Sequence, residues 1–188
     1  MDSVVKNIIQ EDLTGGEIGE MLNGVASVKM YEELEHTSDI MSFLSPHNKV
    51  ALLYPVQSES SGHWLAIWYD ESTHTIHHFD SYGLTPDQEQ RYTQMADVHQ
   101  QLLQQLYANS GARVVYNTVR FQDLKSGDNT CGRHVIVRLR LSYLNEAQYE
   151  QLMMKQSSSP DELVTLLTFL ALNEDSSDAA DIQSILRS

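Results

Sequence analysis

The stretch that indicates the fold spans residues 62–83 and reads GHWLAIWYDESTHTIHHFDSYG. Two runs rich in aromatic and β-branched residues, 63–69 and 75–80, flank the turn-rich residues 70–73. This composition is typical of two antiparallel strands, and residues 80–83 end the second one in a turn. Because the start of one strand of a hairpin lies beside the end of the other, we expect His63 and Asp80 to share one edge of a sheet.

Further strands are predicted on either side of this hairpin. Residues 49–56 form a short apolar run of strand length, followed by a polar loop over 57–62, and residues 113–121 form another strand-like run. Together with the hairpin they predict a central, mostly antiparallel sheet.

Helical segments surround these strands in the sequence. Residues 13–22 predict a capped short helix that buries Ile18, Met21 and Leu22, and residues 27–44 hold one or two more short helices. Later helices are expected at about 86–108, at 131–139, and near 146–155 and 160–173. The β-branched residues in 131–139 would also suit a strand. The sequence therefore predicts an α+β fold, a sheet flanked by helices.

Length and composition predict one globular domain. The chain has 188 residues, 41% of them hydrophobic, which suits a single domain over residues 1–173 with an acidic tail at 174–188. No apolar run reaches the roughly 20 residues that span a bilayer, and the N-terminal residues lack a signal-peptide pattern. We expect a soluble intracellular protein of the cytoplasm, the nucleus or a virion, with no membrane partner.

Charge and cysteine content exclude several kinds of site. The 26 acidic and 12 basic residues give a net charge of −14, which opposes binding to nucleic acid phosphates. This charge favours a basic partner or simply keeps the protein in solution. One cysteine rules out an internal disulfide framework and a multi-thiolate zinc site, and no metal is expected.

That single cysteine, Cys131, follows a polar loop and opens a predicted helix. A helix N-terminus stabilises a thiolate, the nucleophilic form of a cysteine. Gly132, directly after it, would allow a substrate carbonyl to approach the backbone closely. The alternative is a small, buried and inert residue.

A nucleophilic cysteine needs a base, and His63 and His134 are the candidates. His63 stands at the start of a strand and would project from the rim of the sheet, whereas His134 lies one helical turn beyond Cys131. His77 and His78 alternate within a strand, so at least one of them should be exposed. The other histidines lie in a turn, on a helix surface or in poorly defined segments: His36, His47, His74 and His99.

The remaining parts of such a site are an orienting carboxylate and an oxyanion donor. Asp80 can accept a hydrogen bond from the second ring nitrogen of His63, or form an Asx turn over residues 81–83, or do both. The backbone N–H of Cys131 and a nearby side-chain amide would stabilise an oxyanion. Gln122 is the preferred amide, Asn129 is a closer alternative, and Asn117 is a weaker one.

At this point the chain resembles the superfamily of the adenovirus protease (adenain) and the ubiquitin-like-protein proteases, over roughly residues 13–145. The family shares a Gly-His-Trp strand start, an acidic or amide residue about 17 residues later, and a Gln ahead of a Cys-Gly helix start. The matching segments are Gly62–Ile67, Phe79–Gly83, Gln122 and Asn129–Gly132. His63 and Asp80 are 17 residues apart.

The resemblance implies a papain-like, adenain-type cysteine protease with the nucleophile at a helix N-terminus. Cys131 would be the nucleophile, His63 the general base, Asp80 its orienter and Gln122 the oxyanion donor. Trp64 would pack beneath His63, and Trp64, Gly132 and Asn129 would contact substrate. Gln122 lies nine residues before Cys131, a longer spacing than is usual in the family, so Asn129 stays an alternative.

The expected activity is that of a cysteine endopeptidase, and the preferred candidate is a viral enzyme that matures capsid or polyprotein precursors at Gly-rich sites. The alternatives are a protease that removes ubiquitin or a ubiquitin-like modifier, an acetyltransferase built on the same triad, and an inactive binding module. The partner would be a protein substrate, either a viral precursor or a ubiquitin-like conjugate. No cofactor is expected, because the only thiol is reserved for catalysis and adenain's peptide cofactor is held through a disulfide.

Overall fold

The computed structural model of the chain describes residues 9–56, 58–88, 102–123, 129–155 and 159–172. In this part of the chain five strands form one sheet in the order β1-β2-β3-β4-β5. Their bounds are β1 Ser27–Met30, β2 Lys49–Val56, β3 Ser58–Asp70, β4 Thr75–Asp80 and β5 Arg113–Tyr116. The central pairs β2–β3 and β3–β4 are antiparallel, while the edge pairs β1–β2 and β4–β5 are parallel.

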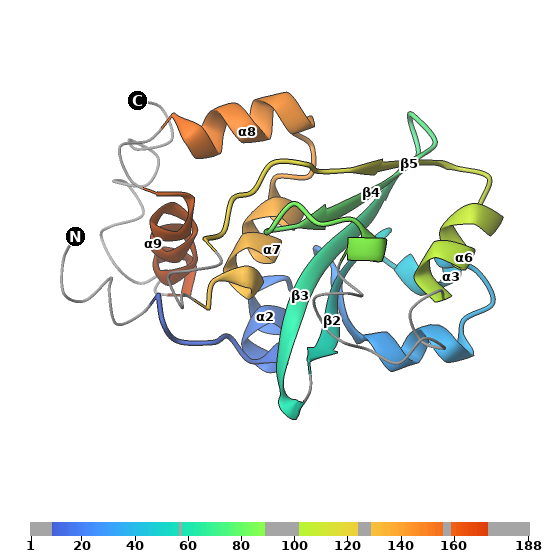
Figure 1. The fold of residues 1–188 in the computed structure, drawn as a ribbon, viewed down its shortest axis with the longest axis horizontal. Helices are drawn as coiled ribbons and strands as arrows, with labels where there is room; N and C mark the ends of the chain where they lie inside the picture. The colour runs from blue at the N-terminus through green and yellow to red at the C-terminus, as the bar shows by residue number, and fades with distance from the viewer. Residues whose placement is uncertain (1–8, 57, 89–101, 124–128, 156–158, 173–188) are drawn as a thin grey trace.

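Helices cover both faces of the sheet (Figure 1). One face carries α2 Gly15–Met21, α7 Cys131–Arg140, α8 Glu146–Met154 and α9 Pro160–Leu172. The other face carries the 3₁₀ helix η1 Tyr31–His36 together with α3 Ile40–Leu44 and α6 Leu102–Asn109. The fold class is therefore α+β, as the sequence predicts. None of the helices in these residues combines the length and apolarity needed to cross a bilayer.

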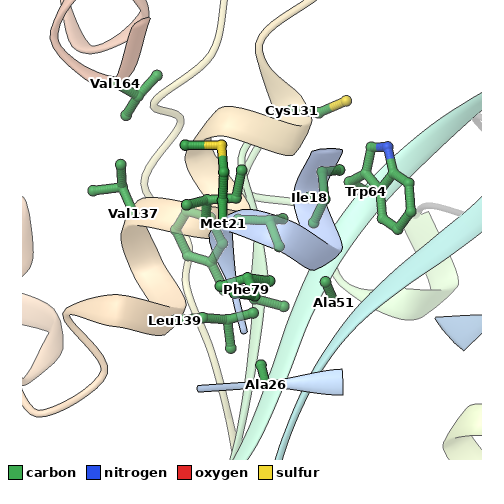
Figure 2. Packing of buried hydrophobic residues seen from close by; sticks show 14 of the residues in the cluster. Ile18, Met21, Ala26, Ala51, Trp64, Phe79, Cys131, Val137, Leu139 and Val164 are labelled. Atoms are coloured by element: carbon green, nitrogen blue, oxygen red, sulfur yellow. The ribbon is translucent and has the colours of Figure 1, made fainter. Parts of the chain in front are cut away.

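The alternation of side chains along β3 divides the core into two clusters. Trp64, Ala66 and Trp68 face α7, α8, α9 and α2, whereas Leu65 and Ile67 face η1, α3 and α6. Successive strand residues point to opposite faces of a sheet, so both faces of β3 are buried. Figure 2 shows the first cluster, in which α2 and the start of α7 pack against Trp64.

Local hydrogen bonds explain where two elements begin and turn. Thr14 and Glu17 form a capping box: Thr14 Oγ1 accepts from the Glu17 N–H at 3.3 Å and Glu17 Oε2 accepts from the Thr14 N–H at 2.8 Å. This cap opens α2, which buries Ile18 and Met21 as predicted. In the β3–β4 turn Asp70 Oδ1 accepts from the Ser72 N–H at 2.9 Å.

Three predicted elements differ from the structure. The expected loop over 57–62 is too long, because β3 already begins at Ser58 and pairs with β2 across an irregular register between Pro55 and Val56. Residues 27–44 hold η1 and α3 as expected, but also the strand β1, which pairs with β2 in parallel. The strand predicted over 113–121 ends at Tyr116.

The prediction of an exposed histidine in β4 is also wrong. His78 is buried and its Nδ1 lies 2.9 Å from the Tyr107 hydroxyl. His77 is half-buried, with its ring stacked on Trp68 at 4.6 Å between centroids. Helices cover both faces of this sheet, so alternation moves a side chain from one buried layer to the other rather than to solvent.

The later helices follow the prediction where they are described. α7, α8 and α9 begin and end within two residues of the expected bounds, so residues 131–139 form a helix rather than a strand. Of the helix expected over 86–108, residues 86–88 and α6 are described and helical, while 89–101 lie outside the described residues, as does the acidic tail 174–188. The division into a domain and a tail stays a prediction.

Candidate active site

The strand β3 brings His63 beside Asp80. Leu65 pairs with Asp80, the last residue of β4, so β4 ends before it reaches the level of His63. The imidazole lies just past this end, where its Nε2 is 2.8 Å from Asp80 Oδ2. Both side chains are buried. His63 lies inside β3 rather than at its start, yet the hairpin brings the two residues together as the sequence predicts.

Asp80 is held from several directions. Its Oδ1 accepts from the Tyr82 N–H at 2.6 Å, which makes an Asx turn, while Oδ2 faces His63. Asn117 brackets its backbone: Asn117 Oδ1 accepts from the Asp80 N–H at 2.8 Å, and Asn117 Nδ2 donates to the Asp80 carbonyl at 2.7 Å. The carboxylate therefore serves both alternatives that the sequence left open. The side chain of Asn117, rather than its backbone, pairs with the end of β4. This explains why β5 stops at Tyr116.

Cys131 is the first residue of α7. Its sulfur points away from the apolar cluster, beside Trp64, as Figure 2 shows. A Cβ on Gly132 would lie 3.0 Å from Ile18 Cδ1 and 3.4 Å from Trp64 Cδ1. The glycine therefore lets the first turn of α7 pack closely on α2 and β3, which fixes the position of Cys131.

The His63 ring links Asp80 to Cys131. The thiol of Cys131 interacts with the ring and contributes to raising the pKa of His63. Since Nε2 faces Asp80, Nδ1 is the nitrogen that can exchange a proton with the sulfur. Burial lowers the pKa of His63, but the charge and hydrogen bond of Asp80 and the interaction with Cys131 outweigh it, so the pKa is raised well above its ordinary value.

The interaction between His63 and Asp80 shifts the pKa of the Asp80 carboxyl group in the opposite direction, downwards. Burial raises the pKa of Asp80, but the charge and hydrogen bond of His63 and the Tyr82 N–H outweigh that effect and lower it. Both shifts favour an ionised carboxylate beside an imidazolium. An imidazolium in this position would in turn stabilise a thiolate on Cys131.

Gln122 and Asn129, the two candidate oxyanion amides, have different hydrogen-bond partners. Gln122 is buried, its Oε1 accepts from the Ser81 hydroxyl at 2.7 Å, and its N–H donates to the Ser81 carbonyl at 3.0 Å. The bond from Ser81 directs the amide Nε2 away from that residue. Asn129 is exposed and its Nδ2 donates to the Gln10 carbonyl at 3.2 Å. The structure thus ties Asn129 to the N-terminal segment and Gln122 to Ser81, the residue after Asp80.

His134, the rival base, is directed elsewhere. Its ring is fully buried, and its Nε2 lies 3.0 Å from Asp161 Oδ1 on α9. No hydrogen-bond partner for its Nδ1 occurs among the described residues. An ionised carboxylate only accepts hydrogen bonds, so Nε2 of His134 is the donor in this contact. His134 therefore pairs with Asp161 on the inner side of the helix.

Sequence reasoning missed two residues of this region and misplaced one contact. The ring that stacks on His63 is Tyr82, at 4.8 Å between centroids and 17° between planes. Trp64, expected beneath His63, packs instead against Gly132 and Gly15. Tyr82 lies within the matched segment 79–83, which was a signal. Asp161 gave none, because an acidic residue in the first turn of a helix is common for electrostatic reasons alone.

Comparison with known proteins gives one relative and a shared fold. No family model matches the chain. The uncharacterized protein V9 of Sputnik virophage is 28% identical over 165 residues, which cover 83% of this chain and 93% of V9. The crystal structure of the ASFV pS273R protease has a TM-score of 0.50 at 17% identity, covering 85% of this chain and 67% of that one. ChlaDub1 of Chlamydia trachomatis gives a TM-score of 0.39 at 14% identity, covering 91% of this chain and 77% of its own.

The likeness to the ASFV protease shows the fold. The chain shares the fold of that protease, and its architecture is α+β, as the sequence predicts. In this chain the nucleophile candidate stands at the start of α7, and the histidine and carboxylate stand on β3 and β4.

Proposed function

We propose that the protein is a cysteine peptidase with Cys131 as nucleophile, His63 as general acid and base, and Asp80 as the residue that orients His63. The observation that carries the proposal is the placement of the His63 ring, which is hydrogen-bonded through Nε2 to a buried carboxylate and also interacts with the only thiol of the chain. This is the geometry in which an imidazole can move a proton to and from sulfur.

In the first step the Cys131 thiolate attacks the carbonyl carbon of the scissile peptide bond. A C–S bond forms and the carbonyl oxygen takes the negative charge. The His63 imidazolium then gives its Nδ1 proton to the leaving amine, the C–N bond breaks, and a thioester remains. In the second step His63 removes a proton from water, the resulting hydroxide displaces the sulfur, and the acid product leaves.

The oxyanion is assigned to two donors, the backbone N–H of Cys131 and the side-chain amide of Gln122. The first lies at the N-terminus of α7, where the helix dipole favours negative charge. The second is supported by the bond from Ser81, which fixes which end of the amide is the donor. Loss of one such donor typically costs about 10²–10³ in kcat.

The raised pKa of His63 supports an ion pair as the resting state. An imidazolium that holds its proton at neutral pH is ready to protonate the leaving amine, and its charge stabilises the thiolate. Asp80 takes part through the tautomer that it imposes and through its charge, and it is not itself protonated in the cycle.

For the substrate we propose a viral precursor protein, cleaved at a Gly-rich site as the resemblance to the adenain superfamily implies. Support comes from the similarity to a virophage protein and from the fold shared with a viral protease. A net charge of −14 suits a basic segment of such a precursor. Trp64 and Gly132, beside Cys131, and Asn129 are the residues proposed to border the substrate.

The test combines two electrophilic probes with one precursor assay. The full chain and its Cys131→Ala variant are incubated with ubiquitin and ubiquitin-like proteins carrying a C-terminal electrophile, and separately with capsid and polyprotein candidates from the same viral genome. Cleavage of a precursor by the wild type only, without labelling by the probes, is the expected result. Labelling of Cys131 would overturn the precursor assignment in favour of deconjugation.

Two further outcomes would overturn the peptidase assignment itself. Transfer of an acetyl group from acetyl-CoA to a protein, lost in Cys131→Ala and without cleavage, would make the protein an acyltransferase. Binding of a precursor with equal affinity by the wild type and Cys131→Ala, with no turnover of any probe, would make it a binding module.

A further inference from the structure

A second buried carboxylate, that of Asp161 in the first turn of α9, contacts residues adjoining both the proposed nucleophile and the proposed oxyanion donor. Asp161 Oδ1 accepts from the Thr130 hydroxyl and lies 3.0 Å from His134 Nε2. Asp161 Oδ2 accepts from the Asp123 N–H at 3.1 Å. The side chain is buried. One carboxylate therefore holds three donors from a different part of the chain.

Two of these donors lie next to the two proposed oxyanion donors in the sequence. Asp123 directly follows Gln122, and Thr130 directly precedes Cys131. Gln122 and Cys131 lie nine residues apart, yet both must face the same oxygen if they are to share an oxyanion. A common acceptor next to each of them fixes the distance between the two donors, however long the chain between them is.

The Thr130 hydroxyl does not cap α7. Thr130 is the N-cap of α7, the position at which a threonine side chain ordinarily accepts a bond from an N–H of the first turn. Here it makes no such bond and donates to Asp161 instead. The first-turn N–H groups of α7 are therefore not capped by Thr130 and can serve a thiolate or an oxyanion.

The neighbouring packing argues for a role beyond stability. α9 already packs on α7 through apolar side chains, among them Leu163 and Val164, which are buried in the same core cluster; Figure 2 shows Val164 beside Val137 of α7. A buried charge with its donors usually contributes no more to stability than apolar residues of the same size would. What the carboxylate adds is a fixed geometry for the residues that it bonds.

We propose that Asp161 is a positioning residue, which holds the backbone on either side of residues 124–128 so that Gln122 and Cys131 face one oxyanion. This inference rests on the proposed function for the roles of Gln122 and Cys131. Asp161 acts through Thr130 and Asp123, to which it is bonded. His134 completes the arrangement by supplying the third donor from α7.

The experiment compares Asp161→Ala, Asp161→Asn and Thr130→Val with a control on the same helix, Val164→Ala. Val164→Ala opens a cavity between α9 and α7 and lowers stability without altering any of the three groups that donate to Asp161. Each full-length variant is assayed below its unfolding transition with a fluorogenic peptide ending in Gly-Gly, and Cys131 is alkylated with iodoacetamide in parallel. Iodoacetamide reports on the thiol without any substrate.

Asp161→Ala is expected to lower kcat by about 10- to 100-fold with KM changed by less than about twofold, because the binding surface stays while the reacting groups are misplaced. Its alkylation is expected to be slower than that of Val164→Ala. Asp161→Asn keeps one carbonyl oxygen and should fall between Asp161→Ala and the wild type. Thr130→Val should lower kcat in the same direction by a smaller factor, and it serves alone if Asp161→Ala does not fold.

The inference is overturned if the variants that fold keep the kcat and alkylation rate of Val164→Ala, or if the loss lies wholly in KM. If the wild type does not cleave the peptide at all, the proposed function fails on its own. The alkylation rates then still test the positioning role of Asp161, since equal rates in wild type, Asp161→Ala and Thr130→Val would contradict that role.

Discussion

Two buried histidine–carboxylate pairs flank the start of α7, and they differ in what surrounds them. His63 Nε2 on β3 lies 2.8 Å from Asp80 Oδ2 at the end of β4, and the His63 ring also interacts with the thiol of Cys131. His134 and Asp161 are 3.0 Å apart between α7 and α9, and there the carboxylate, not the ring, makes the further contacts.

The difference indicates that a histidine–carboxylate contact alone does not mark a base. What distinguishes the His63 pair is a ring that is bonded to the carboxylate through one nitrogen and also interacts with the proposed nucleophile. What distinguishes the His134 pair is a carboxylate that gathers donors from separate segments. The same two residue types therefore suit proton transfer in one place and the positioning of backbone in the other.

The largest effect is expected at the residue between the two pairs. Cys131→Ala should abolish turnover and iodoacetamide labelling, because no other thiol is present in the chain. Circular dichroism and thermal unfolding should resemble those of the wild type, since the substitution removes one sulfur atom at the edge of the core. Peptidase activity that survives in Cys131→Ala would show that Cys131 is not the nucleophile and that the His63 pair has no thiol to activate.

Removing either histidine should separate the two pairs. His63→Ala is expected to lower kcat/KM by about 10²–10⁴, the usual contribution of a general acid or base. His134→Ala should instead lower the free energy of unfolding by about 2 to 4 kcal/mol, because it leaves a cavity and removes a donor from a buried carboxylate.

The measurements are steady-state kinetics and urea unfolding of both variants, with activity referred to the folded fraction. The reverse pattern, a stable but inactive His134→Ala beside an active His63→Ala, would exchange the roles of the two pairs.

The charge of Asp80 should appear in the pH profile. Asp80 raises the pKa of His63, so the imidazolium persists to higher pH than an isolated histidine would allow. Asp80→Asn removes the charge but keeps a hydrogen-bonding group, so kcat/KM should fall by about 10- to 100-fold rather than vanish. The alkaline limb of its pH profile should move to lower pH. A profile that superimposes on the wild type would exclude an orienting role.

The smallest expected effect is the pH dependence of stability at the other pair. Burial raises the pKa of Asp161, but the bonds from His134, Thr130 and the Asp123 N–H outweigh it and lower the pKa. A carboxyl whose folded pKa is depressed stabilises the fold above its unfolded pKa and loses that contribution as the pH falls through the folded pKa. The difference in unfolding free energy between wild type and Asp161→Asn should therefore shrink in acid. Urea unfolding at a series of pH values checks this, and a constant difference would contradict it.

Much of the site could be predicted from the sequence because its central contact is local. His63 and Asp80 belong to one hairpin, whose alternation and turn residues place them at the same end. Cys131 was recognisable because a polar loop precedes it and a helix begins at it. These arguments need only short-range patterns.

The remaining parts depend on contacts between distant segments. Asn117 reaches Asp80 across 37 positions, and Asp161 reaches Thr130 across 31. Neither residue type nor spacing distinguishes Asn117 from an ordinary strand end or Asp161 from an ordinary helix start. The clustering of His77 and His78 in buried layers likewise follows from helices that cover both faces of the sheet, which a strand pattern does not reveal.

The most direct test of the proposed roles is the rate at which iodoacetamide alkylates Cys131 at neutral pH in wild type, His63→Ala and His134→Ala. The structure predicts that His63→Ala reacts markedly more slowly than the wild type, because the thiolate loses its imidazolium partner. His134→Ala should react at close to the wild-type rate. Equal rates in wild type and His63→Ala, with slow alkylation in His134→Ala, would show that the wrong pair has been assigned to the thiol.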